Sequence, residues 1–256
     1  GLGLDNRALL DLLDSTKLPL AVTICDFRPK NKLPKINNKN LKISYQLEKK
    51  FNKNLDRFDI LFRSPGWPLA CPGVQAAQQS GHTEISSPLN LFFALCPTKN
   101  IIGVTGSKGI GTTASLISQI LRDTNQQTKK TDAKKICLGG NIGIAPLSFL
   151  TKIKETDQVV LELSSFQLED LKYSPQISVI TNLFKEHLAP ADPNNPNFHA
   201  SYAAYWRAKL NIAKNKENQY LIANIKLKPK LNNLKLKIKI KYFRASALLS
   251  LIHISQ

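Results

Sequence analysis

The segment from Ile101 to Thr113 constrains this chain more than any other part of its sequence. A short apolar run, Ile101 to Val104, leads into a turn with several glycines, and a helix-compatible segment from Thr112 to Arg122 follows. A strand, a glycine-rich turn and a helix in this order point backbone N–H groups and the positive helix end at a phosphate. The segment therefore predicts a phosphate site in an α/β domain.

The turn departs from the usual phosphate-binding loop at one position. In such loops a lysine follows a glycine just ahead of the hydroxyl residues and reaches the β- and γ-phosphates of a nucleotide. The corresponding place after Gly109 holds Ile110, and Lys108 lies two residues earlier. Thr112 and Thr113 stand at the expected helix start, where a hydroxyl could cap the helix or bind Mg²⁺. Taken alone, the loop leaves a phosphate site and an ordinary glycine-rich turn equally open.

Length and charge bound the class of protein. A chain of 256 residues can hold one large domain or two ordinary ones. The net charge of +18 would suit a nucleic-acid binder. However, the basic stretches Arg28–Arg57 and Lys214–Arg244 contain no zinc-finger or helix-turn-helix pattern. We therefore expect no nucleic-acid partner.

The cysteines and the apolar runs of the sequence indicate the cellular compartment of the protein. Cys25, Cys71, Cys96 and Cys137 form no CxxC pair, which is typical of a reducing cytosol. No apolar run approaches the roughly 20 residues of a membrane span. We expect a cytoplasmic protein without a membrane partner. Because the chain has no methionine and starts within Gly-Leu-Gly, we also expect its true N-terminus to be missing.

Strand-like and helix-like segments alternate, which predicts parallel sheets with helical crossovers. A helical pattern around Leu9–Leu13 precedes a buried strand, Leu20–Cys25, which ends at Asp26. We interpret these segments as the second half of a Rossmann-like βαβ unit whose first strand is cut away. An acid at the end of that strand commonly meets a ribose or base. For Asp26, a simple turn residue is an equal alternative.

The remaining predicted elements follow in chain order. They are a loop at Lys30–Lys42, a strand at Asp59–Phe62, helices at Val74–Ser80 and Pro88–Leu95, a linker at Cys96–Thr98, a glycine turn at Gly139–Gly143, strands at Gln158–Leu161 and Ile177–Asn182, and a helix at Ser201–Ile212. Glu162 ends a strand predicted to adjoin the loop strand, a position from which an acid holds Mg²⁺. The predicted domains are a Rossmann-like domain over 1–97, an incomplete P-loop-type parallel-sheet domain over 98–248 and a non-native tail over 249–256.

Several motifs, in one order along the chain, resemble those of the Mur ligases. They are Gly106-Ser-Lys-Gly, Gly139-Gly-Asn-Ile-Gly, Leu161-Glu-Leu-Ser-Ser-Phe-Gln-Leu-Glu, Thr181-Asn with Glu186-His187, Tyr205-Trp-Arg-Ala-Lys209, and the supporting Arg63-Ser-Pro-Gly turn. The resemblance covers Gly1 to about Lys214. The run that starts at Leu161 indicates the branch that joins D-glutamate to UDP-N-acetylmuramoyl-L-alanine.

The resemblance implies an ADP-forming ligase of peptidoglycan precursor synthesis that acts as a monomer. ATP would phosphorylate the L-alanine carboxylate, and the amine of D-glutamate would attack the acyl phosphate to form an amide. The implied ATP site comprises Gly106, Ser107, Lys108, Gly109, Ile110, Gly111, Thr112 and Thr113. The implied substrate site comprises Asp5, Asp26, Arg28, Ser64, Pro65 and Gly66 at the UDP end and Asn141, Ser164 and Gln167 at the muramoyl end.

The resemblance also implies two Mg²⁺ ions. Their ligands would be Thr112, Glu162, His187 and a carbamylated Lys209, the last three being the implied catalytic residues. For Lys209, an exposed helix lysine is the alternative, because an unmodified lysine is a cation and a poor metal ligand.

Departures from the family pattern leave other functions open. Ile110 predicts a loss of roughly a hundredfold in rate, and Glu186 replaces the family's aspartate. After Asn224 the family pattern is lost and the third domain is absent, so we expect the chain as it stands to be inactive. The alternatives are a non-catalytic UDP-sugar or nucleotide-binding remnant, a sister ligase that adds another amino acid, and a nucleic-acid binder.

Overall fold

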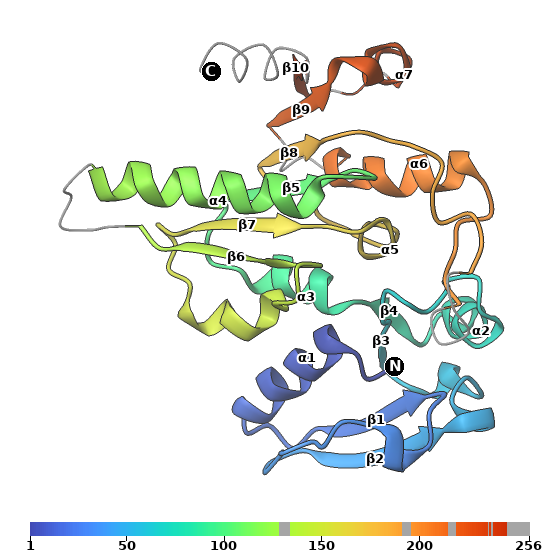
Figure 1. Ribbon diagram of the computed structural model, residues 1–256. Helices are drawn as coiled ribbons and strands as arrows, with labels where there is room; N and C mark the ends of the chain where they lie inside the picture. The colour runs from blue at the N-terminus through green and yellow to red at the C-terminus, as the bar shows by residue number, and fades with distance from the viewer. Residues whose placement is uncertain (128–133, 191–195, 215–218, 235, 237, 245–256) are drawn as a thin grey trace. The chain divides into compact units, whose positions relative to one another are not determined.

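The computed structural model describes residues 1–127, 134–190, 196–214, 219–234, 236 and 238–244 (Figure 1). The described residues fall into two compact units. The first comprises Gly1–Cys96, Gly143–Lys152 and Ala189–His199, and the second comprises Pro97–Ile142, Ile153–Leu188 and Ala200–Gln256. The chain thus crosses into the second unit at Pro97 and returns twice to the first. The tail expected at 249–256 lies outside the described residues.

The first unit contains two small parallel sheets and three α-helices. Strand β1 (Ala21–Asp26) pairs with β2 (Lys42–Leu47), and β3 (Ile60–Phe62) pairs with β4 (Glu84–Ser86). The helices are α1 (Leu4–Ser15), α2 (Pro72–Ser80) and α3 (Pro88–Leu95), with 3₁₀ turns at Lys30–Lys32, Glu48–Lys50, Leu55–Arg57 and Pro146–Lys152. The parallel α/β character predicted from the sequence is confirmed in this unit.

Local sequence signals set the ends of these helices. Helix α3 starts with Pro88 in its first turn, and the Ser87 hydroxyl accepts a 3.2 Å hydrogen bond from the Asn90 N–H. Helix α2 ends at Gly81, whose φ of 69° lies in the left-handed region. Leu10 of α1 packs with Leu2, Ile24 and Leu41, so that α1 covers the β1–β2 sheet.

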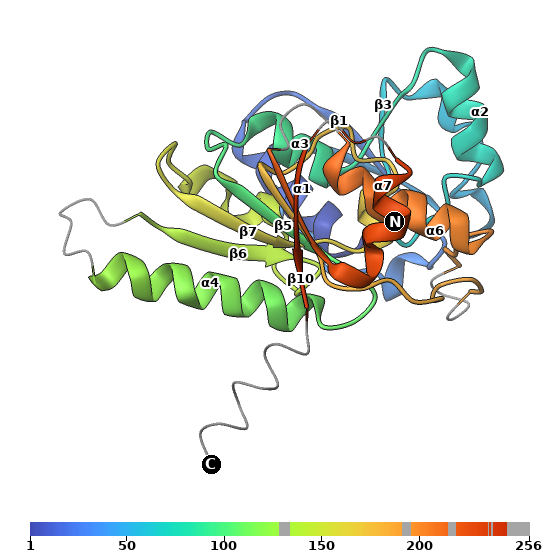
Figure 2. The same cartoon turned by 90° about the horizontal axis from the view of Figure 1, so that it is seen from above.

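The second unit is built on one six-stranded parallel sheet with the order β10-β9-β8-β5-β7-β6 (Figures 1 and 2). The strands are β5 (Ile101–Thr105), β6 (Ile136–Gly140), β7 (Gln158–Glu162), β8 (Ile177–Ile180), β9 (Tyr220–Asn224) and β10 (Lys239–Phe243). The helices are α4 (Ile110–Gln127), α5 (Ser165–Leu168), α6 (Tyr202–Leu210) and α7 (Lys228–Asn232), with 3₁₀ turns at Asn211–Ala213 and Ile225–Leu227. The predicted parallel sheet is confirmed.

The core of this unit lies between the sheet and α4, which packs against β5, β6 and β7. Val104 of β5, Val160 of β7 and Val179 of β8 meet Ala114 of α4 in one apolar cluster. Burying apolar side chains on neighbouring parallel strands is typical of a sheet covered by helices. The central place of β5 brings the strands that flank it, β7 and β8, beside the glycine turn.

Several predicted boundaries were wrong. Helix α4 begins at Ile110 and not at Thr112, and strand β2 begins at Lys42, where the sequence predicted the end of a loop. Strand β4 was not predicted. No strand was predicted after Asn224, but β10 pairs with β9 in parallel register, Lys239 opposite Tyr220. Lysines that alternate with apolar residues suit an exposed edge strand.

Candidate functional site

The loop between β5 and α4 needs glycine at specific positions. A Cβ atom at Gly106 would clash with the Thr181 hydroxyl oxygen, and Gly109 has a φ of 72° in the left-handed region. Only glycine adopts both arrangements without strain. The loop thus brings its own backbone against the carboxyl end of β8, as a phosphate-binding turn requires.

Asn182, just after β8, holds this loop through both ends of its side-chain amide. Its Oδ1 accepts a 2.9 Å hydrogen bond from the Lys108 N–H, and its Nδ2 donates one of 2.9 Å to the Lys108 carbonyl. The Ser107 N–H donates to the Asn182 carbonyl at 2.9 Å. These three bonds fix the peptide planes of the loop before any ligand arrives.

The Ser107 hydroxyl connects the loop to helix α6. It lies 2.7 Å from the Tyr205 hydroxyl and accepts a 2.8 Å hydrogen bond from the Phe184 N–H. Tyr205 is fully buried, and burial raises the pKa of its hydroxyl to about 12. Tyr205 therefore stays neutral and can act as a fixed hydrogen-bonding partner for the loop.

The start of α4 differs from the sequence prediction. The Thr113 hydroxyl donates a 2.7 Å hydrogen bond back to the Gly109 carbonyl and does not cap the helix. Thr112 is exposed. Ile110 packs against the apolar cluster of Val104 and its neighbours. The half-buried residue in the usual lysine place therefore packs against the core, and the loop presents backbone groups with no cation from that position.

Glu162 stands beside this loop. It ends β7 and lies opposite Val104 of β5, because β5 and β7 are neighbours. Its Oε1 accepts a 3.0 Å hydrogen bond from Asn141 Nδ2, and a Cβ at Gly111 would lie 2.8 Å from its Oε2. The structure therefore brings Glu162 and Asn141 together, as the sequence predicted. It also places Gly111 beside them.

Sequence reasoning missed the meaning of Gly111. In a phosphate-binding loop the residue directly after the lysine is Ser or Thr, and its hydroxyl binds Mg²⁺. Counting one residue on from Ile110 reaches Gly111, not Thr112. The geometry agrees with this count, since Gly111 faces the Glu162 carboxylate and Thr112 is exposed to solvent. The position that faces Glu162 has no hydroxyl in this chain.

Lys209 lies deep in the second unit, with only 2% of its surface exposed. Its Nζ donates a 3.0 Å hydrogen bond to Thr105 Oγ1, whose hydroxyl donates to the Leu163 carbonyl at 2.7 Å. Burial lowers the pKa of its amine to about 7, against the opposing charges of Glu186 and Glu162. The alternative of an exposed helix lysine is therefore wrong, and a large fraction of Lys209 is a neutral amine near pH 7.

His187 occupies a strained backbone position near Lys209. Its φ of 57° lies in the left-handed region, which is uncommon for a residue other than glycine. Its ring meets Phe166 edge to face at 5.2 Å between centroids and lies 6.0 Å from the Tyr205 ring. Burial and then the Lys209 charge lower the pKa of His187, and Glu186 opposes them. Such strain is common where a side chain must be aimed.

The implied metal ligands do not form a ready cluster. Within the described part of the chain, no group of three or more His, Cys, Asp or Glu side chains is arranged to hold a metal ion. Among the described residues, Glu162 is the acid beside the glycine loop that the sequence and the geometry both indicate. A single carboxylate fits Mg²⁺ that is held mostly by water and by phosphate oxygens.

Ser164 and Gln167 bond to each other. The Ser164 hydroxyl accepts from the Gln167 N–H at 3.2 Å, and Gln167 Oε1 accepts from the Ser164 N–H at 3.1 Å. This reciprocal capping box starts the short helix α5 directly after Glu162. Both residues, predicted to contact substrate, first of all fix the turn at the end of β7.

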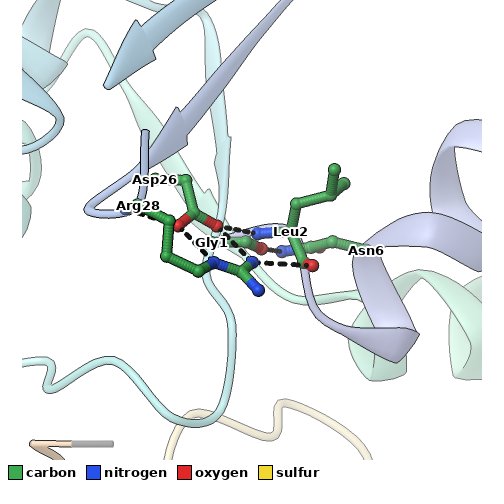
Figure 3. Close-up of polar contacts among 5 residues, drawn as sticks. All are labelled: Gly1, Leu2, Asn6, Asp26 and Arg28. Atoms are coloured by element: carbon green, nitrogen blue, oxygen red, sulfur yellow. Dashed lines mark hydrogen bonds and ion pairs between the residues drawn. The ribbon is translucent and has the colours of Figure 1, made fainter. Parts of the chain in front are cut away.

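In the first unit, two of the predicted UDP-end residues, Asp26 and Arg28, lie together beside Gly1 and Leu2 (Figure 3). The Asp26 carboxylate accepts hydrogen bonds from the Leu2 N–H at 2.7 Å and from Arg28 Nε and Nη2 at 2.9 and 2.8 Å. The Arg28 N–H adds a bond of 3.0 Å, and Arg28 Nη2 also donates to the Leu2 carbonyl at 3.1 Å. Burial alone would raise the pKa of Asp26, but these hydrogen bonds outweigh it and lower the pKa to about 2.

The Ser64–Gly66 turn meets the start of α1 at the same place. A Cβ at Gly1 would lie 3.8 Å from the Ser64 Cβ, and a Cβ at Gly3 would lie 3.8 Å from the Ser64 hydroxyl. Asn197 Nδ2 donates a 2.6 Å hydrogen bond to the Pro65 carbonyl, so a segment far along the chain supports the turn. Asp5 lies in the first turn of α1. A glycine turn at a helix start is an anion-binding geometry.

Comparison with known proteins shows the family of this chain. The family model for the Mur ligase middle domain matches residues 104–247. The chain is 43% identical over 174 residues to UDP-N-acetylmuramoylalanine--D-glutamate ligase of Acetivibrio thermocellus, covering 68% of this chain and 34% of the relative. It is 37% identical over 227 residues to the same-named ligase of Ruminiclostridium cellulolyticum, covering 88% and 44%. The chain belongs to the Mur ligase family.

The family match corrects one boundary from the sequence. The resemblance to the Mur ligases was expected to end at about Lys214, but the middle-domain match continues to residue 247. Strands β9 and β10 belong to the region it covers. The chain spans less than half the length of these two relatives, 34% and 44%.

Among solved structures, the MurF ligase from Thermotoga maritima in complex with ADP matches with a TM-score of 0.42. It is 17% identical, and the match covers 75% of this chain and 51% of that chain. None of the helices that the structure describes in this Mur ligase chain is long and apolar enough to cross a membrane.

Proposed function

We propose that this Mur ligase chain carries the ATP-binding site and the UDP-binding site of a ligase that joins D-glutamate to UDP-N-acetylmuramoyl-L-alanine. The observation that supports it most is the placement of Glu162 at the end of β7, beside the glycine loop that follows β5. That pairing of an acid with a glycine loop is the arrangement that nucleotide phosphates and Mg²⁺ require. The names of the matched relatives supply the substrates.

The proposed reaction has two steps. The carboxylate of the L-alanyl substrate attacks the γ-phosphorus of ATP, which releases ADP and forms an acyl phosphate. The amine of D-glutamate then attacks the acyl carbon, an amide bond forms, and phosphate leaves as the amine loses a proton. In the first step negative charge grows on the γ-phosphate oxygens, so donors fixed in advance are the chain's main contribution.

Within the chain, the loop Gly106–Gly111 would supply backbone N–H groups to the phosphates. Its peptide planes are already fixed by Asn182 and by the Ser107–Tyr205 hydrogen bond. Bound Mg²⁺ would neutralise phosphate charge, and Glu162 is the carboxylate positioned to hold it. Gly111 provides no hydroxyl, so Glu162 is the only protein oxygen ligand that we assign to that ion. Asn141 orients the Glu162 carboxylate through its hydrogen bond.

Lys209 would provide a second anion after modification. A neutral amine can attack the carbon of CO₂, so that an N–C bond forms and the nitrogen loses a proton, which gives a carbamate. The pKa near 7 leaves a large fraction of Lys209 neutral at physiological pH, as this step needs. We propose that the carbamate and His187 would hold a second Mg²⁺.

The first unit would hold the UDP end of the substrate. The turn at Gly1–Gly3, the Ser64–Gly66 turn and Asp5 would face the nucleotide, while Asp26 and Arg28 keep the turn in place through their mutual bonds. We propose that the protein acts as a cytoplasmic monomer, without a nucleic-acid partner.

The test is ADP release by the protein with ATP, Mg²⁺, UDP-N-acetylmuramoyl-L-alanine and D-glutamate. We expect ADP only when both substrates are present, together with a product whose mass has increased by D-glutamate minus water. UDP-sugar binding without ADP release would favour the non-catalytic remnant. Product formation with a different amino acid would favour a sister ligase.

Residues 1–256 by themselves should bind ATP weakly and form no amide. Ile110 stands in the place of the usual lysine, so the loop lacks a cation for the phosphates there. The matched relatives are more than twice as long as the part of them that this chain covers. Equilibrium titration with a fluorescent ATP analogue measures the first expectation. D-glutamate ligation by these 256 residues would contradict the second.

A further inference from the structure

Among the described residues, basic side chains without acidic partners gather at the end of the six-stranded sheet that β10 forms (Figure 1). From Ala200 to Arg244 the sequence contains a single acid, Glu217. Exposed lysines stand on helix α7, which joins β9 to β10, and on β10 itself. Within the described part of the chain, none of them lies in an ion pair. They are Lys228, Lys230, Lys239 and Lys241.

On β10, both exposed lysines cover one tyrosine. The Nζ atoms of Lys239 and Lys241 lie 5.7 and 5.8 Å from the centre of the Tyr220 ring. Tyr220 stands opposite Lys239 in the parallel register of β9 and β10, so the three side chains share one face of the sheet. An ammonium group within about 6 Å of a ring centre is attracted by the negative face of the ring. The tyrosine thus takes the place of a carboxylate as the partner of two lysines.

On helix α7, the exposed lysines cover aromatic rings of other elements. Lys228 Nζ lies 5.7 Å from the ring centre of Tyr242 of β10, which points to the other face of the sheet. Lys230 Nζ lies 4.5 Å from the ring centre of Tyr202 and 5.3 Å from that of Trp206, both on α6. Ammonium groups therefore flank the β10 edge on both faces of the sheet.

The chemistry of this surface favours an anionic lipid bilayer over a nucleic acid. Proteins that bind single strands stack bases on open aromatic faces, but here ammonium groups already lie over the rings. Lysine acts as a point charge, whereas base recognition relies mostly on the planar groups of Arg, Asn and Gln. Leu234, just after α7, is 41% exposed. An apolar side chain gains free energy in the interface of a bilayer and not beside a phosphate backbone.

Aromatic residues and lysines together are typical of protein surfaces that meet membranes. Tyr and Trp are enriched at the membrane–water interface, because their rings have an apolar body and a polar end. Each lysine near an anionic bilayer raises partitioning by about fivefold. The expectation of no membrane partner came from the absence of a run long enough to span a bilayer. Binding at the surface needs no such run.

We propose that the β10 end of the second unit is a docking surface for an anionic lipid bilayer. The four exposed lysines would face the phosphate headgroups, and Leu234 would enter the headgroup region. The residues of this surface belong to neither the ATP site nor the UDP site. The contact would therefore be separate from the proposed ligase reaction.

Sedimentation of the 256-residue chain with lipid vesicles tests the proposal. The probes are vesicles of phosphatidylcholine alone and vesicles of equal parts phosphatidylglycerol and phosphatidylcholine. We expect binding to the anionic vesicles only, and weaker binding as salt is raised from about 50 to about 300 mM, because salt screens exposed charges. Equal binding to both kinds of vesicle would overturn the proposal, as would binding to neither.

Substitutions on β10 locate the contact. Lys239→Gln with Lys241→Gln should lower the partition coefficient on anionic vesicles by about 25-fold, since each lysine contributes about fivefold. Lys49→Gln with Lys50→Gln is the matched control, because both are exposed lysines of the first unit and the change in net charge is the same. An equal loss in the two variants would show that net charge alone drives binding, which would contradict the assignment.

Tryptophan fluorescence gives a second measurement that removes no charge. The sequence has two tryptophans, so Trp206 is the single one in a Trp67→Phe variant. Vesicles made with brominated phosphatidylglycerol should quench its emission, because Trp206 lies beside Lys230 on the docking surface. Emission that stays unquenched while the chain sediments with these vesicles would place the contact elsewhere and overturn the assignment.

Titration with a mixed-sequence single-stranded RNA examines the other anionic partner. We expect an affinity no tighter than ordinary non-specific binding, about 1 μM at physiological salt. Tighter RNA binding that is lost in Lys239→Gln with Lys241→Gln would assign the surface to nucleic acid, and the proposal would then fail.

Discussion

Asp26 and Glu162 occupy the same kind of place in the two units. Each is the last residue of a parallel strand, and each adjoins a glycine turn that begins a helix. Their partners differ. Asp26 receives hydrogen bonds from the Leu2 and Arg28 backbones and from the Arg28 side chain, whereas Glu162 Oε1 receives one from Asn141 and Oε2 faces Gly111.

This difference separates a carboxylate that holds a turn from one that can bind a ligand. A carboxylate accepts about four hydrogen bonds, and the donors around Asp26 supply that number. Glu162 keeps an oxygen directed at the loop, where Mg²⁺ and phosphate would lie. An acid at a strand end is thus not a ligand by position alone; the local supply of donors decides its role.

The largest effect on turnover should come from replacing Lys209, which lies in the same unit as Glu162. Lys209→Ala should lower ligase turnover by at least about a hundredfold, because it removes the anion proposed to hold a second Mg²⁺. The assay is ADP release by the full-length protein, with Lys214→Ala as the control on the same segment. Recovery of activity with small carboxylates would support the role, and unchanged turnover would eliminate it.

Ile110→Lys should raise ATP turnover by about a hundredfold, since a lysine there would reach the phosphates. It should also lower stability by about 1–3 kcal/mol, because the half-buried Ile110 side chain packs against the core. Ile117→Lys is the matched control, since Ile117 packs against the same cluster seven residues along α4. A gain in turnover in both variants would show that the loop cation is not the cause.

Asp26→Asn and Glu162→Gln make the same chemical change in the two units. Asp26→Asn should lower the free energy of unfolding by about 2 kcal/mol, while Glu162→Gln should change it by less than about 1 kcal/mol and abolish turnover. Urea unfolding measures both, with the exposed Asp11→Asn as control. Equal destabilisation by the two substitutions would remove the distinction between the carboxylates.

The Asp26 effect should depend on pH in a defined direction. Its pKa is about 2 in the folded chain against the ordinary 3.8, so the carboxylate stabilises the fold above pH 3.8. That stabilisation is lost as the pH falls through about 2. The difference in unfolding free energy between the original chain and Asp26→Asn should therefore shrink as the pH is lowered over this range. A difference that does not change with pH would contradict the assignment.

The smallest effect should come from Tyr205→Phe, which removes the 2.7 Å bond to Ser107. We expect a loss of about 1 kcal/mol in stability and a few-fold weaker ATP binding, because the loop is less firmly held. Tyr202→Phe removes a hydroxyl that donates to Leu183 at 3.2 Å on the same helix. It should cost similar stability without affecting ATP, and a matching loss of ATP affinity would argue against a specific role for Tyr205.

The glycine loop and Glu162 could be predicted because continuous apolar strands and glycine spacing are local signals. Strands β2 and β10 could not, since none of their side chains is buried and polar residues or lysines alternate along them as in a loop. Their pairing depends on neighbours elsewhere in the chain.

The burial of Lys209 was also beyond local reasoning. Its partner Thr105 is 104 residues away, and the helix sequence gives no sign that the lysine points inward. The same holds for Asp26, whose role depends on Leu2 and Arg28 arriving from two separate segments. Residue type suggested chemistry in both cases, and only the packing decided between its alternatives.

Strand β10 has a consequence for how this protein behaves at high concentration. Among the described residues it is one edge of the six-stranded sheet, and Lys239 and Lys241 stand on it as exposed side chains. An open strand edge can recruit the edge of another molecule and start fibrillar aggregation, and repeated positive charges oppose that approach by mutual repulsion. The lysines that obscured this strand in the sequence therefore help to keep the protein dispersed, and salt that screens them should weaken that protection.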